Sequence, residues 1–167
     1  METKNKNQIV KDIKEKSILI SREFDAPLAN VWRAFTESEL LDKWWAPKPW
    51  RAETKVLKFT VGGYWIYAMV SPEGEKHWGR MNYISIDHHK NFTIEDAFCD
   101  ENGNFNKELP ASTGKISFTS TQNGSRVDFK MFYQTESDLQ KIVEMGFEQG
   151  ISATLDYLEN LFTQNEI

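Results

Sequence analysis

The fold is decided by one stretch near the C-terminus, residues 135–163, which reads TESDLQKIVEMGFEQGISATLDYLENLFT. Its apolar residues recur every three or four positions, as they do along one face of a helix. Thr135 is a candidate N-cap, and Asp138 three residues later completes a pair similar to a capping box. The stretch predicts a single helix, and its buried face comprises Leu139, Val143, Phe147, Ile151, Leu155 and Leu158.

The sequence before this helix is typical of antiparallel strands. Apolar and polar residues alternate in several segments, and tight turns are favoured at Gly62-Gly63, Pro72-Glu73-Gly74 and Asn123-Gly124. Helical spacing occurs in two short pieces between residues 27 and 45, with a break near residues 36–38. The seven expected strands cover residues 17–24, 52–59, 63–71, 76–86, 91–98, 113–121 and 125–133.

No second helix of comparable length is expected, so the apolar face of the terminal helix has to pack on the sheet. Strands followed by one long helix indicate an α+β arrangement, and a chain of 167 residues fits one domain. We expect that domain at residues 17–163, after a polar leader at 1–16 and before a short tail at 164–167. The leader is rich in lysine and is expected to pack weakly.

The composition argues against several classes of partner. The formal net charge of −5 disfavours a nucleic-acid-binding face, and Cys99 is the only cysteine, so an intrachain disulfide is excluded. Neither a secretory signal nor a membrane-spanning apolar run is evident, which predicts a cytoplasmic protein without membrane insertion. Motifs for metal or nucleotide binding are missing as well, so no metal or cofactor is expected, and the chain is expected to be a monomer or a homodimer.

Several short motifs resemble the activator-of-Hsp90-ATPase-homologue-like (AHSA1-like) family of the START/Bet v 1-like (SRPBCC) superfamily. They are Phe24-Asp25-Ala26-Pro27 with Val31-Trp32 and Phe35, Trp44-Trp45-Ala46-Pro47, the Gly62-Gly63 turn, Gly74 and Gly79, and the helix from Gly146-Phe147 to Leu158. The resemblance covers roughly residues 17–163. It implies a helix-grip fold: a seven-stranded antiparallel sheet wrapped around the long helix, two short helices between the first two strands, and a cavity between sheet and helix.

Few residues offer obvious catalytic chemistry. His88 and His89 fall in an expected turn and are best interpreted as solvated, while His77 begins a strand without a visible carboxylate partner. Cys99 lacks an evident base that would activate it as a nucleophile. These residues are expected to be structural, and an enzymatic role is less favoured than a binding role.

Gly146 and Gly150 lie four residues apart, on the same face of the expected helix. Each destabilises a helix relative to Ala by up to about 1 kcal/mol, so the missing side chain is expected to have a use. The favoured interpretation is close approach of the helix to the sheet, and the alternative is room for a ligand.

The aromatic share of 13%, with six Trp, suits a core that contains a cavity. In the Trp44-Trp45 pair, one ring is expected to fill the core and the other to border the cavity mouth, unless both are structural. The candidate ligand-binding residues are Trp45, Trp65, Tyr67, Met81, Phe118, Phe129, Met131, Phe147 and Ile151.

Three functions remain open from the sequence. The first is a module that binds a small hydrophobic, apolar or aromatic molecule in the cavity. The second is an enzyme that uses a Tyr, His or Glu in the same cavity as an acid or base. The third, which the family resemblance implies, is an interaction protein like the Hsp90 co-chaperones.

Overall fold

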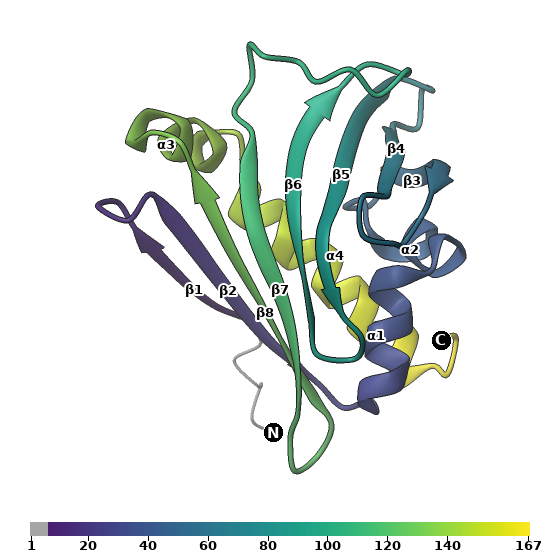
Figure 1. Ribbon diagram of the computed structural model, residues 1–167. Helices are drawn as coiled ribbons and strands as arrows, with labels where there is room; N and C mark the ends of the chain where they lie inside the picture. The colour runs from purple at the N-terminus through teal and green to yellow at the C-terminus, as the bar shows by residue number, and fades with distance from the viewer. Residues whose placement is uncertain (1–6) are drawn as a thin grey trace.

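The computed structural model describes residues 7–167 and consists of one antiparallel sheet with four helices in that range (Figure 1). The strand order is β1-β2-β8-β7-β6-β5-β4-β3. The strands are β1 (Asn7–Asp12), β2 (Ser17–Phe24), β3 (Arg51–Leu57), β4 (Tyr64–Val70), β5 (Lys76–Asp87), β6 (Asn91–Cys99), β7 (Ser112–Ser120) and β8 (Ser125–Tyr133). The helices are α1 (Leu28–Thr36), α2 (Ser38–Trp44), α3 (Glu136–Glu144) and α4 (Phe147–Thr163).

The α+β class, the antiparallel sheet and the long C-terminal helix are confirmed, and the arrangement is consistent with a helix-grip fold. The sheet has eight strands rather than the expected seven, because residues 7–12 form a strand where a weakly packed leader was expected. The expected leader's first six residues lie outside the described residues. No helix of residues 7–167 is long and apolar enough to cross a membrane.

The additional strand β1 is held by its first residue as well as by its ladder with β2. Asn7 lies opposite Arg22 in the register, and its Oδ1 accepts a hydrogen bond of 2.9 Å from the Arg22 guanidinium. Its Nδ2 donates to the Ser152 hydroxyl at 2.8 Å. Asn7 therefore connects the sheet edge to α4, an interaction between distant segments that local polarity does not reveal.

The expected single helix at 135–163 is divided into α3 and α4. Thr135 caps α3 as expected, because its hydroxyl accepts the Asp138 N–H at 3.0 Å. The helix then stops, since Gly146 adopts the left-handed conformation with φ of 88° and becomes the N-cap of α4. Only α4 crosses the inner face of the sheet, while α3 turns aside toward the end of β8 (Figure 1).

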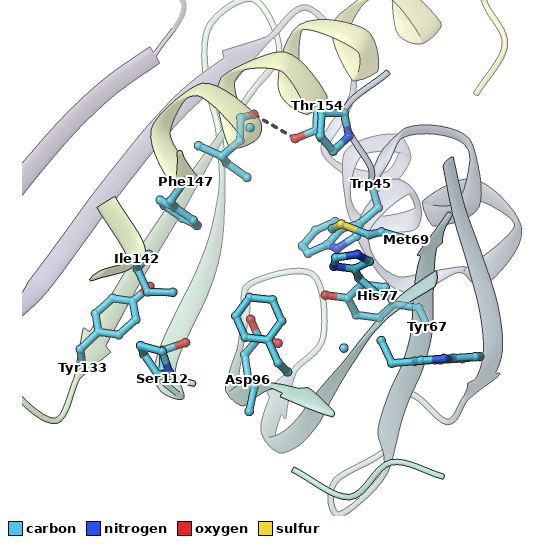
Figure 2. A pocket seen from close by; sticks show the side chains of 18 residues that line it. Trp45, Tyr67, Met69, His77, Asp96, Ser112, Tyr133, Ile142, Phe147 and Thr154 are labelled. Atoms are coloured by element: carbon cyan, nitrogen blue, oxygen red, sulfur yellow. Dashed lines mark hydrogen bonds between the residues drawn. The ribbon is translucent and has the colours of Figure 1, made fainter. Parts of the chain in front are cut away.

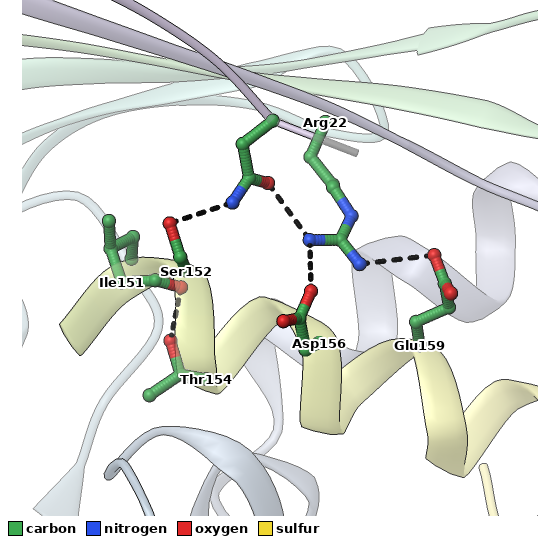
Figure 3. A network of polar contacts seen from close by, with 7 residues as sticks. Arg22, Ile151, Ser152, Thr154, Asp156 and Glu159 are labelled. Carbon is green, nitrogen blue, oxygen red and sulfur yellow. Dashed lines mark hydrogen bonds and ion pairs between the residues drawn. The ribbon is translucent and has the colours of Figure 1, made fainter. Parts of the chain in front are cut away.

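The C-terminal half of α4 is fixed to the sheet by apolar and ionic contacts. Leu155, Leu158 and Leu161 are buried in the core. The Arg22 side chain on β2 has no exposed surface, and it forms ion pairs with Asp156 at 2.8 Å and Glu159 at 3.1 Å (Figure 3). Such a paired, buried guanidinium fixes the position of α4 along the sheet.

The N-terminal half of α4 packs less tightly. Of the residues expected on the buried face, Leu139, Leu155 and Leu158 are fully buried, whereas Val143, Phe147 and Ile151 are only partly buried. The expectation of one continuous buried stripe therefore needs correction at the α3–α4 junction. The helix leaves the solid core at this end, and a pocket lies beneath it.

The two helix glycines should respond in opposite directions to alanine. Gly146→Ala should destabilise the protein by about 1–2 kcal/mol, because a Cβ disfavours the left-handed backbone. Gly150→Ala should stabilise it by up to about 1 kcal/mol, since no atom lies within 4 Å of the added Cβ. Urea unfolding of both variants tests the division of the helix; equal effects would contradict it.

Truncation of a buried leucine measures the grip of α4 on the sheet. Leu155 is fully buried, so Leu155→Ala should lower the free energy of unfolding by ~2–5 kcal/mol. Asn160→Ala changes an exposed position of the same helix and is the matched control. A loss no larger than that of the control in a denaturant melt would show that α4 does not depend on this contact.

Candidate functional site

A pocket of about 270 Å³ lies between the first turns of α4 and one end of the inner sheet face (Figure 2). Phe147, Gly150, Ile151 and Thr154 of α4 line one side of it. The Thr154 hydroxyl donates to the Ile151 carbonyl at 2.9 Å. The α4 side of the pocket is therefore largely apolar.

Sheet register explains which side chains meet on the opposite side. Asp96 of β6 lies opposite Ser112 of β7, which in turn lies opposite Tyr133 of β8. One row away, Tyr67 of β4 lies opposite Gly79 of β5. All five residues line the pocket, so the five neighbouring strands from β4 to β8 contribute to a single wall.

Gly79 makes room for the Tyr67 ring. A Cβ at Gly79 would lie 2.7 Å from both Cζ and the hydroxyl oxygen of Tyr67, which is too close for any side chain. The phenol therefore lies across the backbone of β5 and brings its hydroxyl group to the pocket wall. This close approach is one that Gly permits because it lacks a Cβ.

Gly150 provides space instead of close contact. A Cβ built there meets no atom within 4 Å, and the nearest atom to a Cβ at Gly146 is 3.8 Å away. The favoured expectation, in which both glycines allow close approach to the sheet, is therefore wrong. Gly146 is required by its left-handed backbone, whereas Gly150 leaves the pocket open beneath α4.

The structure brings four of the candidate ligand-binding residues to this pocket: Trp45, Tyr67, Phe147 and Ile151. Of the Trp44-Trp45 pair, Trp44 is fully buried in the core and Trp45 borders the pocket. Contact of these residues with a ligand stays a prediction.

The other five candidates lie in the packed core, away from the pocket lining. They are Trp65, Met81, Phe118, Phe129 and Met131. Phe118 packs edge-on against Trp32 and Phe35 of α1 with ring centroids 4.9 and 5.3 Å apart. Strand alternation predicts correctly that such residues face inward. Because α1 and α2 cover only part of the inner face, some inward-facing residues pack against these helices and others border the pocket.

Asp96 is the most informative residue that the sequence analysis missed. It occupies an inward position of β6, in the alternation Phe92, Ile94, Asp96 and Phe98. A charged residue at a core-facing position is unusual, so this pattern could have identified it. Other lining residues outside the predicted set include Met69, Pro110, Ser112, Tyr133 and Ile142. Alternation predicts which face of a strand is buried, but not which end of that face borders the pocket.

Burial gives the Asp96 carboxyl unusual properties. Desolvation raises its pKa to about 7, although the Ala97 backbone N–H partly offsets this effect. Burial also raises the pKa values of the Tyr67 and Tyr133 phenols, and the nearby Asp96 charge raises them further. These phenols therefore stay protonated and can donate hydrogen bonds at neutral pH.

The Trp45 indole N–H is a second polar group at the pocket. It is buried and has no hydrogen-bond partner of ordinary geometry, although it lies near enough to the Tyr67 hydroxyl to lower that phenol's pKa slightly against the effect of burial. Buried N–H groups are normally paired. A bound molecule with an acceptor atom could satisfy this one.

The other candidate reactive residues lie at the edge of this site or outside it. His77 lines the pocket but is exposed, with its Nε2 3.4 Å from a Glu75 carboxylate oxygen. His89 packs near Trp32 with ring centroids 5.4 Å apart. Burial raises the pKa of the Cys99 thiol to about 11, which opposes formation of a nucleophilic thiolate. In the described part of the chain, no three His, Cys, Asp or Glu side chains are placed to hold a metal ion.

Solved structures with the same fold extend over nearly the entire chain. A protein from Mycobacterium smegmatis is 27% identical with a TM-score of 0.87, and the match covers 95% of this chain and 98% of that one. A protein from Arthrobacter aurescens is 29% identical with a TM-score of 0.88, covering 94% and 91%. The AHSA1 protein from Silicibacter pomeroyi, at 15% identity and a TM-score of 0.70, covers 89% and 99% and shows the fold alone.

No curated protein matches the chain. The model of the family described as "Activator of Hsp90 ATPase homolog 1-like protein" matches residues 25–163. This range contains all strands except β1 and β2, and all four helices. The chain therefore belongs to the activator of Hsp90 ATPase homolog 1-like family.

Proposed function

We propose that the protein binds a small, largely apolar or aromatic molecule in the pocket beneath α4. The observation that carries this proposal is the open space at Gly150, on a helix whose other half is packed solidly on the sheet. A helix glycine that neither packs closely nor adopts a special backbone conformation reduces stability. Its contribution is the volume of the pocket.

The volume and lining restrict the size of the ligand. At about 270 Å³ the pocket lies slightly below the ~300–1,000 Å³ typical of small-molecule sites. A compact molecule with one or two rings fits this space better than a long lipid chain. Aromatic walls from Trp45, Tyr67 and Phe147 suit such a ring.

A second candidate function is an enzyme that acts on a hydrophobic substrate in the same pocket. Asp96 favours it, because a carboxyl with a pKa of about 7 is suited to proton transfer near neutral pH. Among the residues of this pocket, Asp96 suits this role better than the Tyr, His or Glu that the sequence leads us to expect. The co-chaperone-like function remains a prediction from the family's name, without a specific contact in the described residues that favours it.

Filling the pocket from α4 tests the binding function. Gly150→Leu should place its side chain in the open space and abolish the thermal stabilisation given by 2-naphthylmethanol, a compact aromatic probe. Gly150→Ala is the matched control and should retain it. In wild type, a probe at a hundredfold excess over its Kd should stabilise the protein by ~2.7 kcal/mol. Equal probe binding by Gly150→Leu and wild type would refute this location.

The acidity of Asp96 predicts a pH-dependent cost in stability. Its folded-state pKa of about 7 exceeds the ~3.9 expected for an unfolded chain, so its contribution is most favourable below pH ~4 and is lost as pH rises through 7. Relative to wild type, Asp96→Asn should therefore gain more melting temperature at pH 8 than at pH 5. Glu95→Gln, which changes the adjacent outward-facing carboxylate, should not show this difference. An Asp96→Asn effect that is the same at both pH values would contradict the assignment.

A further inference from the structure

Among the described residues that line the pocket there is one acidic side chain and no Lys or Arg. Of these described lining residues, only Asp96 has a carboxylate, ammonium or guanidinium side chain. Within the described residues, no ion pair joins Asp96 to a Lys, Arg or His. Among residues 7–167, an ionised Asp96 therefore has no ion-paired positive partner, and a carboxylate among apolar side chains is costly without one.

The position of Asp96 leaves its carboxyl available to a ligand. Its cross-strand neighbours are Met81 and Ser112, neither of which carries a charge. Figure 2 shows it on the sheet between Ser112 and Tyr133 on one side and Tyr67 and His77 on the other, below Phe147 of α4. The acid thus lies centrally on the pocket wall rather than at its rim.

Aromatic side chains surround this carboxyl on several sides. Those lining the pocket from α4, the α2 end and three strands include Phe147, Trp45, Tyr67, Phe98 and Tyr133. The faces of aromatic rings carry partial negative charge and attract organic cations, which is how aromatic cages recognise ammonium groups. One carboxylate within an aromatic lining has the chemistry that such cations require.

We propose that the pocket selects a small organic cation, namely an ammonium group attached to an apolar or aromatic body, with Asp96 as its counter-ion. This inference rests on the proposed binding function and names its ligand class. The cation pairs with the carboxylate, and the apolar body lies beneath α4 in the space left by Gly150. Carboxylate ligands such as fatty acids are disfavoured, because they would meet a like charge and no Lys or Arg in the lining.

The affinity for the cation should fall as pH is lowered, because Asp96 takes up a proton. Groups that act electrostatically with Asp96 are the phenols of Tyr67 on β4, Tyr83 on β5 and Tyr133 on β8, together with the Cys99 thiol on its own strand. Burial raises the pKa values of all four, so they remain protonated up to at least pH 8. His77 is the remaining titratable group in the lining.

The test compares three probes of nearly the same shape: 2-naphthylmethylamine, which is a cation, 2-naphthylmethanol, which is neutral, and 2-naphthoic acid, which is an anion. Calorimetry at pH 8 should show that the wild type binds the amine at least ten times more tightly than the alcohol, and the acid most weakly. Between pH 8 and pH 6 the amine's affinity should fall by about tenfold, because Asp96 takes up a proton.

Asp96→Asn should remove both the preference for the amine and its pH dependence, while the alcohol still binds. Glu95→Gln, with its carboxylate on the opposite face of β6, is the matched control and should retain both. The inference is overturned if the wild type binds alcohol and amine equally, if it prefers the acid, or if Asp96→Asn retains the pH dependence. In each of these cases, probe binding that Gly150→Leu abolishes would still support the proposed function. If none of the three probes binds, both this inference and the proposed function are overturned.

Discussion

The buried guanidinium of Arg22 connects β2 to α4 and to the edge strand β1. A buried guanidinium requires partners, because losing one leaves an uncompensated charge that is strongly destabilising. Arg22 meets this requirement with Asp156 and Glu159, and also with Asn7 of β1. One residue thereby fixes the C-terminal half of α4 to the sheet and secures the edge strand, so that the leucines of α4 face the core in a single register.

This anchor at one half of α4 explains why the other half can cover a pocket. Gly146 separates α3 from α4, and Phe147 and Ile151 in the first turns of α4 are only partly buried. The side chains missing at Gly79 and Gly150 then have complementary effects. Gly79 allows the Tyr67 ring to lie flat on the sheet, and Gly150 keeps the opposite wall open. The solid core and the pocket lie at opposite ends of the same sheet face. The pocket lies beyond the part of that face that α1 and α2 cover.

Much of this fold could be predicted from local pattern, because hairpin turns, strand alternation and the helical stripe are all encoded by neighbouring residues. The strand β1 could not, since it depends on Asn7 reaching Arg22 and Ser152, more than a hundred residues away in the second case. Strand alternation predicts which residues face inward but not which of them meet α1 and which meet the pocket. It therefore predicts Phe118 as a ligand contact and leaves out Tyr133, which lines the pocket. Asp96 is recognisable from the sequence as a charged residue at a core-facing position.

In the proposed function, the ligand lies beneath the start of α4, and the packed aromatic core stays in place. Indole N–H resonances of the six Trp residues test this location directly. The Trp44 and Trp65 indoles donate to the Ala34 carbonyl at 2.9 Å and the Thr54 hydroxyl at 3.0 Å, whereas the buried Trp45 indole has no hydrogen-bond partner of ordinary geometry. In a titration of ¹⁵N-labelled protein with 2-naphthylmethylamine, the Trp45 resonance, assigned from Trp45→Phe, should shift most. Trp44 and Trp65 should show smaller shifts, because their ring centroids lie 5.2 and 5.1 Å from that of Trp45. Shifts of the Trp44 or Trp65 resonances as large as that of Trp45 would contradict ligand binding beneath the start of α4.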